Sequence, residues 1–148
     1  QLIANVKPGL SIWGDHDLLA EMLANLLDNA IRHTPKGTRI EFSLKKRGSK
    51  LVASMADSGP GIPAEDRNNV FRRFYRLERS RTTPGSGLGL SLVAAVAELH
   101  GIELLLDDNA PGLRITLAFD AHQELEPGLS KEIGNEPAGI VSAVANWR

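Results

Sequence analysis

The sequence predicts an α/β fold: a two-layer sandwich in which a mixed sheet of about five strands is covered on one face by about three helices. Apolar residues recur at helical spacing in two long segments, residues 18–31 and 88–100. Shorter alternating runs lie between and after them, and turn sequences such as RGS at 47–49 join these runs as hairpins. At 148 residues, the chain has the length of one ordinary domain.

The composition excludes several classes of protein. Apolar residues make up 42% of the chain and charged residues 24%, which is typical of a packed globular domain. The net charge of −1 argues against nucleic-acid binding through a general basic surface. No apolar run approaches the roughly 20 residues that span a bilayer, so we expect no membrane contact by this segment. Cysteine is absent, which excludes disulfides and agrees with a cytoplasmic location.

The first quarter of the chain is predicted to hold one strand and one long helix. The short apolar run Leu10–Trp13 favours a strand. Either Asp15 or Asp17 can cap the helix that follows, and the TPKG sequence at 34–37 ends it.

The rest of the chain alternates between strands and helices. A strand over 40–44 and a partner over 51–56 form the first hairpin. A short helix is predicted over 64–74 and a long one over 88–100, where Gly101 is well placed as the stop. Two closing strands are expected at Leu104–Leu106 and Leu113–Phe119.

Four polar residues, Glu21, Asn25, Asn29 and His33, form a stripe along one edge of the first helix's apolar face, because they recur every four residues. An amide oxygen is a neutral hard ligand that suits Mg²⁺ where a polyphosphate already supplies the negative charge. The plainer interpretation, that the stripe is the solvated side of an amphipathic helix, stays open at this point.

Two glycine-rich segments border predicted elements. One follows a predicted strand, and the other precedes a predicted helix. DSGPGIP at 57–63 comes directly after a strand, so Asp57 can accept from an exocyclic amine such as N6 of adenine, although a plain turn is an alternative. GSGLGL at 85–90 opens a helix, where backbone N–H groups attract an anion. It does not match the dinucleotide fingerprint and has no P-loop lysine, so we interpret it as a phosphate-contacting loop.

An arginine-rich segment, FRRFYRLERSR at 71–81, lies between these loops. A solvated basic face would explain it. An alternative is that at least one arginine reaches a nucleotide phosphate, because the guanidinium fork suits phosphate geometry.

Taken together, these segments resemble the catalytic ATP-binding domain of sensor histidine kinases, in the superfamily shared with gyrase B, the Hsp90 chaperones and MutL. NLLDNAIRHTP at 25–35 looks like the N box, DSGPGIP the G1 box, FRRFYR the F box and GSGLGL the G2 box. The resemblance covers about residues 10–119 and implies a Bergerat-type ATP-binding fold. Two departures, Ile102 after Gly101 and Leu113 after Gly112, lie in the closing strands.

The resemblance implies a set of roles. Asn29 would ligate Mg²⁺, and Asn25 would lie near the triphosphate and its metal. Asp57 would bind the adenine amine, and residues 77–86 would form a lid over ATP. Asn25 and Arg76 would be the catalytic residues, with Arg76 approaching the γ-phosphate. The other residues expected to contact the nucleotide are Arg32, His33, Gly59, Gly61, Ile62, Gly85, Ser86, Gly87, Leu88 and Gly89.

The resemblance also implies a function: binding of Mg-ATP and transfer of its γ-phosphoryl group to a histidine. The acceptor would lie on a separate dimerisation domain of a longer parent protein, which could be anchored in the inner membrane. None of the four histidines, His16, His33, His100 and His122, has the H-E-x-x-T-P context of such an acceptor. A response regulator would take the phosphate downstream.

Three alternatives remain at this level. A degenerate nucleotide-binding or docking module would bind without transfer. An ATPase of the gyrase or chaperone kind would carry a glutamate as general base at the position of Asn25, which cannot take a proton. A Ser/Thr kinase of the anti-sigma type shares the fold, but the FRRFYR box favours a sensor kinase.

We expect residues 1–120 to form the catalytic domain and residues 121–148 a C-terminal extension, either flexible or packed on the domain. The second possibility would use an apolar helix face formed by Ile140, Val141, Val144 and Trp147.

Overall fold

The computed structural model describes residues 1–10, 12–77 and 86–120. Most of the expected lid and the whole C-terminal extension therefore lie outside the described residues. Neither described α-helix combines the length and the apolar character needed to cross a membrane.

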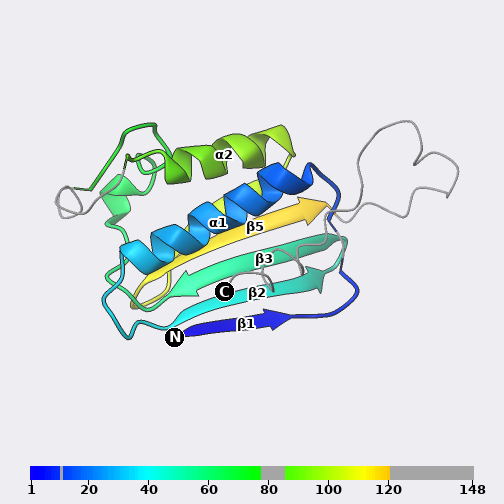
Figure 1. Cartoon of the computed structure of the whole chain (residues 1–148), viewed down its shortest axis with the longest axis horizontal. Coiled ribbons are helices and arrows are strands. Elements are labelled where there is room, and N and C mark those ends of the chain that lie inside the picture. The colour runs from blue at the N-terminus through cyan, green and yellow to red at the C-terminus, as the bar shows by residue number, and fades with distance from the viewer. Residues whose placement is uncertain (11, 78–85, 121–148) are drawn as a thin grey trace, which may run out of the picture.

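A five-stranded mixed sheet forms one layer of the protein, as predicted (Figure 1). The strand order is β1-β2-β3-β5-β4; β1 runs parallel to β2 and the other neighbours are antiparallel. Parallel pairing places Leu2 opposite Ile40, and the β2–β3 hairpin turns between Arg47 and Lys50. The strands are β1 Leu2–Val6, β2 Ile40–Arg47, β3 Lys50–Asp57, β4 Glu103–Asp108 and β5 Leu113–Asp120.

Two α-helices, α1 (His16–Arg32) and α2 (Gly89–Leu99), lie side by side over one face of the sheet (Figure 1). Asp15 is the residue that caps α1, because its Oδ1 accepts from the backbone N–H of Leu18 at 3.0 Å. Gly101 follows α2 at φ +63°, the left-handed conformation that ends many helices. The core between the layers is formed by residues such as Leu19, Met22, Leu44, Val93 and Leu117.

The predicted helix over 64–74 is wrong, so the helix count is slightly lower than expected. Only one turn of 3₁₀-helix forms, at Ala64–Asp66, and turns continue to Phe74. Within 64–74 only Val70 is buried, so a regular helix there would have little apolar surface to cover.

The predicted strand at Leu10–Trp13 is also wrong. Ile12 makes a single bridge and is buried in the core, at 4% exposure, within a connecting segment. The edge strand is instead Leu2–Val6, which pairs with a strand that begins 34 positions after Val6, at Ile40. Edge strands bury little side-chain surface, so the apolar pattern of β1 is weak.

Candidate functional site

A cavity of about 620 Å³ opens where α1, the end of β3, the F-box segment and the start of α2 meet. It contains most of the residues singled out from the sequence. Gly59 and Leu88 do not line it, and Gly85 lies outside the described part of the chain. The predicted residues that line it are Asn25, Asn29, Arg32, His33, Asp57, Gly61, Ile62, Arg76, Ser86, Gly87 and Gly89.

The cavity also has an apolar wall that the motifs did not reveal. Its members come from strands β3 and β5, the F-box side and α2, so no local sequence signal joins them. A mostly apolar lining with a few polar groups is typical of small-molecule sites. These residues are Met55, Val70, Leu90, Leu113 and Ile115.

Asp57, the last residue of β3, is a buried carboxylate at 8% exposure. Its Oδ1 accepts from the backbone N–H of Gly59 at 2.8 Å and, more weakly, of Leu113 at 3.4 Å. These two donors hold the carboxylate in one orientation beside the apolar wall. A buried carboxylate has further acceptor capacity, which an amine on a ligand can use.

The loop after Asp57 packs closely on two other segments. A Cβ placed on Gly59 would lie 2.5 Å from Cγ2 of Thr34, so Gly59 joins the G1 loop to the end of α1 without lining the cavity. A Cβ on Gly61 would lie 2.8 Å from the carbonyl oxygen of Gly112. The loop is thus held by contacts that only glycine permits.

Two amides, Asn25 and Asn29, meet the first residue of α2. A Cβ on Gly89 would lie 3.2 Å from Oδ1 of Asn25 and 3.6 Å from Nδ2 of Asn29. Nδ2 of Asn29 is buried and has no hydrogen-bond partner among the described residues. A buried amide with unused capacity at a helix N-terminus points to a ligand there.

The donor set at this place fits Mg²⁺ carried in by a polyphosphate. Among the described residues, no group of three or more His, Cys, Asp or Glu side chains could hold a metal ion. Mg²⁺ keeps waters and takes few protein oxygens when phosphates supply the others. An amide oxygen from Asn29 matches that requirement.

Arg32 lies at the rim of the cavity, paired with Asp28. Its Nε lies 2.6 Å from Oδ2 of Asp28, one helical turn earlier. The hydrogen bond to Asp28 raises the pKa of Arg32 above its ordinary value. Asp28 also lines the cavity and was not singled out from the sequence.

The F-box and G2 segments are in backbone contact with each other. The N–H of Phe74 donates to the carbonyl of Gly87 at 3.0 Å. Gly87 has φ +72°, and a Cβ there would lie 3.0 Å from the backbone of Phe74 and Tyr75. The Tyr75 hydroxyl donates to the carboxylate of Asp66, and this hydrogen bond raises the pKa of Tyr75.

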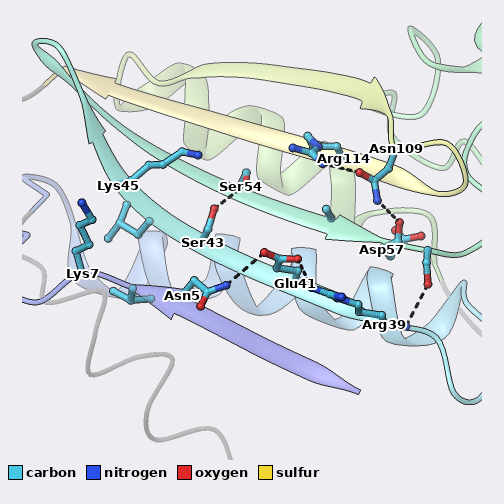
Figure 2. Close-up of a pocket in the computed structure, with 14 residues that line it drawn as sticks. Asn5, Lys7, Arg39, Glu41, Ser43, Lys45, Ser54, Asp57, Asn109 and Arg114 are labelled. Atoms are coloured by element: carbon cyan, nitrogen blue, oxygen red, sulfur yellow. Dashed lines mark hydrogen bonds and ion pairs between the residues drawn. The ribbon is translucent and has the colours of Figure 1, made fainter.

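A second cavity of about 690 Å³ lies on the sheet face away from the helices (Figure 2). Figure 2 shows polar side chains on the strands and just beside them. They include the ion pair of Arg39, which precedes β2, with Glu41 at 3.0 Å and the hydroxyl pair of Ser43 with Ser54 at 3.0 Å. Asp57 is the one predicted site residue in its lining. The chemistry expected from the motifs therefore gathers at the first cavity.

Comparison with known proteins agrees with this geometry. The model of the family described as "Histidine kinase-, DNA gyrase B-, and HSP90-like ATPase" matches residues 14–123. The solved structure titled "Mycobacterial sensor histidine kinase MprB" has a TM-score of 0.73 and 36% sequence identity, covering 81% of this chain and 82% of that one. The catalytic domain of histidine kinase ThkA, at 24% identity and a TM-score of 0.72, shares the fold.

The curated relatives are also histidine kinases. The signal transduction histidine-protein kinase/phosphatase MprB of Mycolicibacterium smegmatis is 43% identical over 131 residues, which cover 83% of this chain and 26% of that protein. The sensor-like histidine kinase SenX3 of the same species is 39% identical over 128 residues, covering 84% and 33%. The chain thus spans between a quarter and a third of the length of these relatives.

The chain belongs to the family of histidine kinase-, DNA gyrase B- and HSP90-like ATPases. Within that family it is of the sensor histidine kinase type.

Proposed function

We propose that this chain binds Mg-ATP in the cavity between α1 and the start of α2 and donates the γ-phosphoryl group to a histidine on a separate dimerisation domain of its parent protein. The observation that carries the proposal is the pair of amides, Asn25 and Asn29, against Gly89 in the same cavity as the buried Asp57. One cavity thereby offers a site for a base and a site for a metal-bound polyphosphate.

The base would lie against the apolar wall. Asp57 would accept from the exocyclic amine of adenine, since its carboxylate is already oriented by the N–H of Gly59. Guanine carries a carbonyl at the corresponding position, which Asp57 would repel. The apolar side chains from β3, β5 and α2 would cover the ring.

The phosphates would lie at the start of α2, where unpaired backbone N–H groups and the helix dipole favour an anion. Asn29 would hold Mg²⁺, which when bound neutralises charge on the phosphates. Arg76 lines the cavity and would approach the γ-phosphate, and Arg32 would contact the chain of phosphates from the rim.

Two carboxylates line the cavity in the described residues, Asp28 and Asp57, and both are already engaged. Asp28 pairs with Arg32, and Asp57 accepts from backbone N–H groups. Asn25, at the position where hydrolytic relatives would carry a glutamate, cannot act as a base. These features favour transfer over hydrolysis and give no support to the ATPase alternative.

Mixing this chain with the parent's dimerisation domain and labelled ATP tests the proposal. We expect acid-labile, base-stable label on that domain, which depends on Mg²⁺ and on Asn29. Binding of ATP without transfer would favour the degenerate module. Rapid release of inorganic phosphate by the chain alone would favour the ATPase.

We also propose the arrangement around this site. Residues 1–120 would form the catalytic domain, which is supported by the end of β5 at Asp120, and residues 121–148 an extension beyond it. The domain would act in the cytoplasm, where ATP is available, whether or not the parent is anchored in the inner membrane. A response regulator would receive the phosphate from the parent's histidine.

A further inference from the structure

Among the described residues, the side-chain amide of Asn25 is held by Glu21, one helical turn earlier. Nδ2 of Asn25 donates to the Glu21 backbone carbonyl at 2.9 Å and to its carboxylate Oε1 at 3.0 Å. Both partners are acceptors, so only the amino end of the amide can face them. The orientation of this amide is therefore dictated by chemistry.

The amide oxygen of Asn25 then faces the opposite way, toward α2. A Cβ built on Gly89 would lie 3.2 Å from this oxygen, and 3.8 Å from Oδ1 of Asn29. The first turn of α2 thus has two amide side chains beside it. Asn25 lines the cavity, whereas Glu21 is exposed and does not.

We propose that Glu21 is a positioning residue, which holds Asn25 so that an acceptor, and not a donor, faces the bound Mg-ATP. This inference rests on the proposed function. An acceptor is attracted to Mg²⁺ and to the waters that the ion keeps, and it is repelled by phosphate oxygens. Asn25 would then serve the hydrated metal rather than the phosphates, and Glu21 would set how strongly Mg²⁺ strengthens ATP binding.

Without the Glu21 carboxylate, the amide of Asn25 has only the backbone carbonyl to hold it and can rotate so that its amino group faces the nucleotide. The amino group favours phosphate without metal. Loss of Glu21 should therefore lower the affinity for Mg-ATP while leaving the affinity for metal-free ATP unchanged or higher. A general loss of structure would lower both affinities together.

Calorimetry with a non-hydrolysable ATP analogue, with Mg²⁺ and with EDTA, tests this in the full chain. The quantity compared is the dissociation constant measured with EDTA divided by the dissociation constant measured with Mg²⁺. In Glu21→Ala we expect that ratio to fall about tenfold from its wild-type value, which is the lower end of what the loss of one charged hydrogen bond predicts. Glu21→Gln should keep the wild-type ratio, because its amide oxygen still accepts from Asn25. Glu98→Ala, which removes an exposed glutamate from α2, is the matched control for charge.

An unchanged ratio in Glu21→Ala, beside normal wild-type binding, would overturn the inference and leave the proposed function intact. A ratio in Glu21→Gln as low as in Glu21→Ala would also overturn it, because charge alone would then explain the effect. Absence of binding by the wild type would instead reject the proposed function.

A measurement without nucleotide gives an independent answer. We expect the side-chain NH₂ protons of Asn25 to exchange faster with solvent in Glu21→Ala than in the wild type or Glu21→Gln. Equal exchange rates in the three proteins would contradict the hydrogen bond itself.

Discussion

Nε2 of His100 accepts a hydrogen bond from the backbone N–H of Asp15 at 3.1 Å and so joins the end of α2 to the beginning of α1. Nδ1 of the same ring lies 2.8 Å from the carbonyl oxygen of Val96. A neutral imidazole with its proton on Nδ1 satisfies both contacts. A Cβ placed on Gly14 would lie 2.7 Å from the ring, so glycine there makes room for it. The two helices that border the candidate site are thus connected at the ends that lie away from it.

We expect His100→Ala to lower the free energy of unfolding by about 1–3 kcal/mol, because the backbone N–H of Asp15 loses its partner. His100 does not line the cavity, so ATP affinity should change by less than about twofold, which is below 0.5 kcal/mol. Urea denaturation and calorimetry measure the two quantities. An unchanged unfolding midpoint would contradict a stabilising role of the imidazole ring.

Among the described glycines, Gly112 leaves the least room for a side chain. A Cβ there would lie 1.8 Å from the carbonyl oxygen of Asp57, and the residue has φ +114°. We expect Gly112→Ala to destabilise the protein by about 4 kcal/mol or more, in the range seen for core disruption.

Gly48→Ala is the matched control, since its φ is +59° and no atom lies within 4 Å of the added Cβ. Backbone conformation alone should cost about 1–2 kcal/mol there. Denaturation curves of the two variants should therefore differ clearly, and equal midpoints would show that the contact with Asp57 is not close.

Gly89 lets α2 begin directly against Asn25. Gly89→Ala improves helix propensity by up to about 1 kcal/mol, so the melting temperature should stay equal or rise. The added Cβ would crowd Oδ1 of Asn25, which lies 3.2 Å from it, and we expect affinity for Mg-ATP to fall about tenfold. Thermal unfolding and calorimetry on the same preparation separate the two effects. Unchanged affinity would place the phosphates away from this contact.

Asp108, at the β4–β5 turn, makes the stability of the protein depend on pH. The backbone N–H of Ala110 donates to Oδ1 of Asp108 at 2.9 Å, and Arg67 lies 3.3 Å from Oδ2. The hydrogen bond from Ala110, with help from Arg67, lowers the pKa of Asp108 below its usual value of about 3.9. Stability from this group is therefore fully present above about pH 4 and is lost as the pH falls through the lowered folded pKa.

The difference in unfolding free energy between the wild type and Asp108→Asn should accordingly be positive at pH 7 and shrink at pH 3 and below. Comparing the variant with the wild type at each pH removes the contribution of other titrating groups. A difference that grows on acidification would contradict the direction of the shift.

Local patterns predicted the β2–β3 hairpin and both long helices well, because alternation and helical periodicity depend on neighbours in the sequence. Strand β1 was missed, since its partner in the described sheet, β2, begins far along the chain and its exposed edge leaves a weak pattern. The short helix over 64–74 was predicted in error, because Val70 is the one apolar residue of that segment that is buried.

The motifs located most of the polar residues around the candidate site, but not the contacts that orient them. The spacing shows that Glu21 and Asn25, like Asp28 and Arg32, lie one helical turn apart. Spacing alone does not show which of these pairs form or how their side chains are oriented. The apolar wall comes from separate elements that only folding brings together.

Calorimetric titration of the chain with a non-hydrolysable ATP analogue in the presence of Mg²⁺ tests the central claim most directly. We expect saturable binding at one site, lost in Asn29→Ala and much weaker when the analogue carries guanine instead of adenine. No measurable binding at millimolar analogue, with the protein folded, would contradict a nucleotide site between α1 and α2.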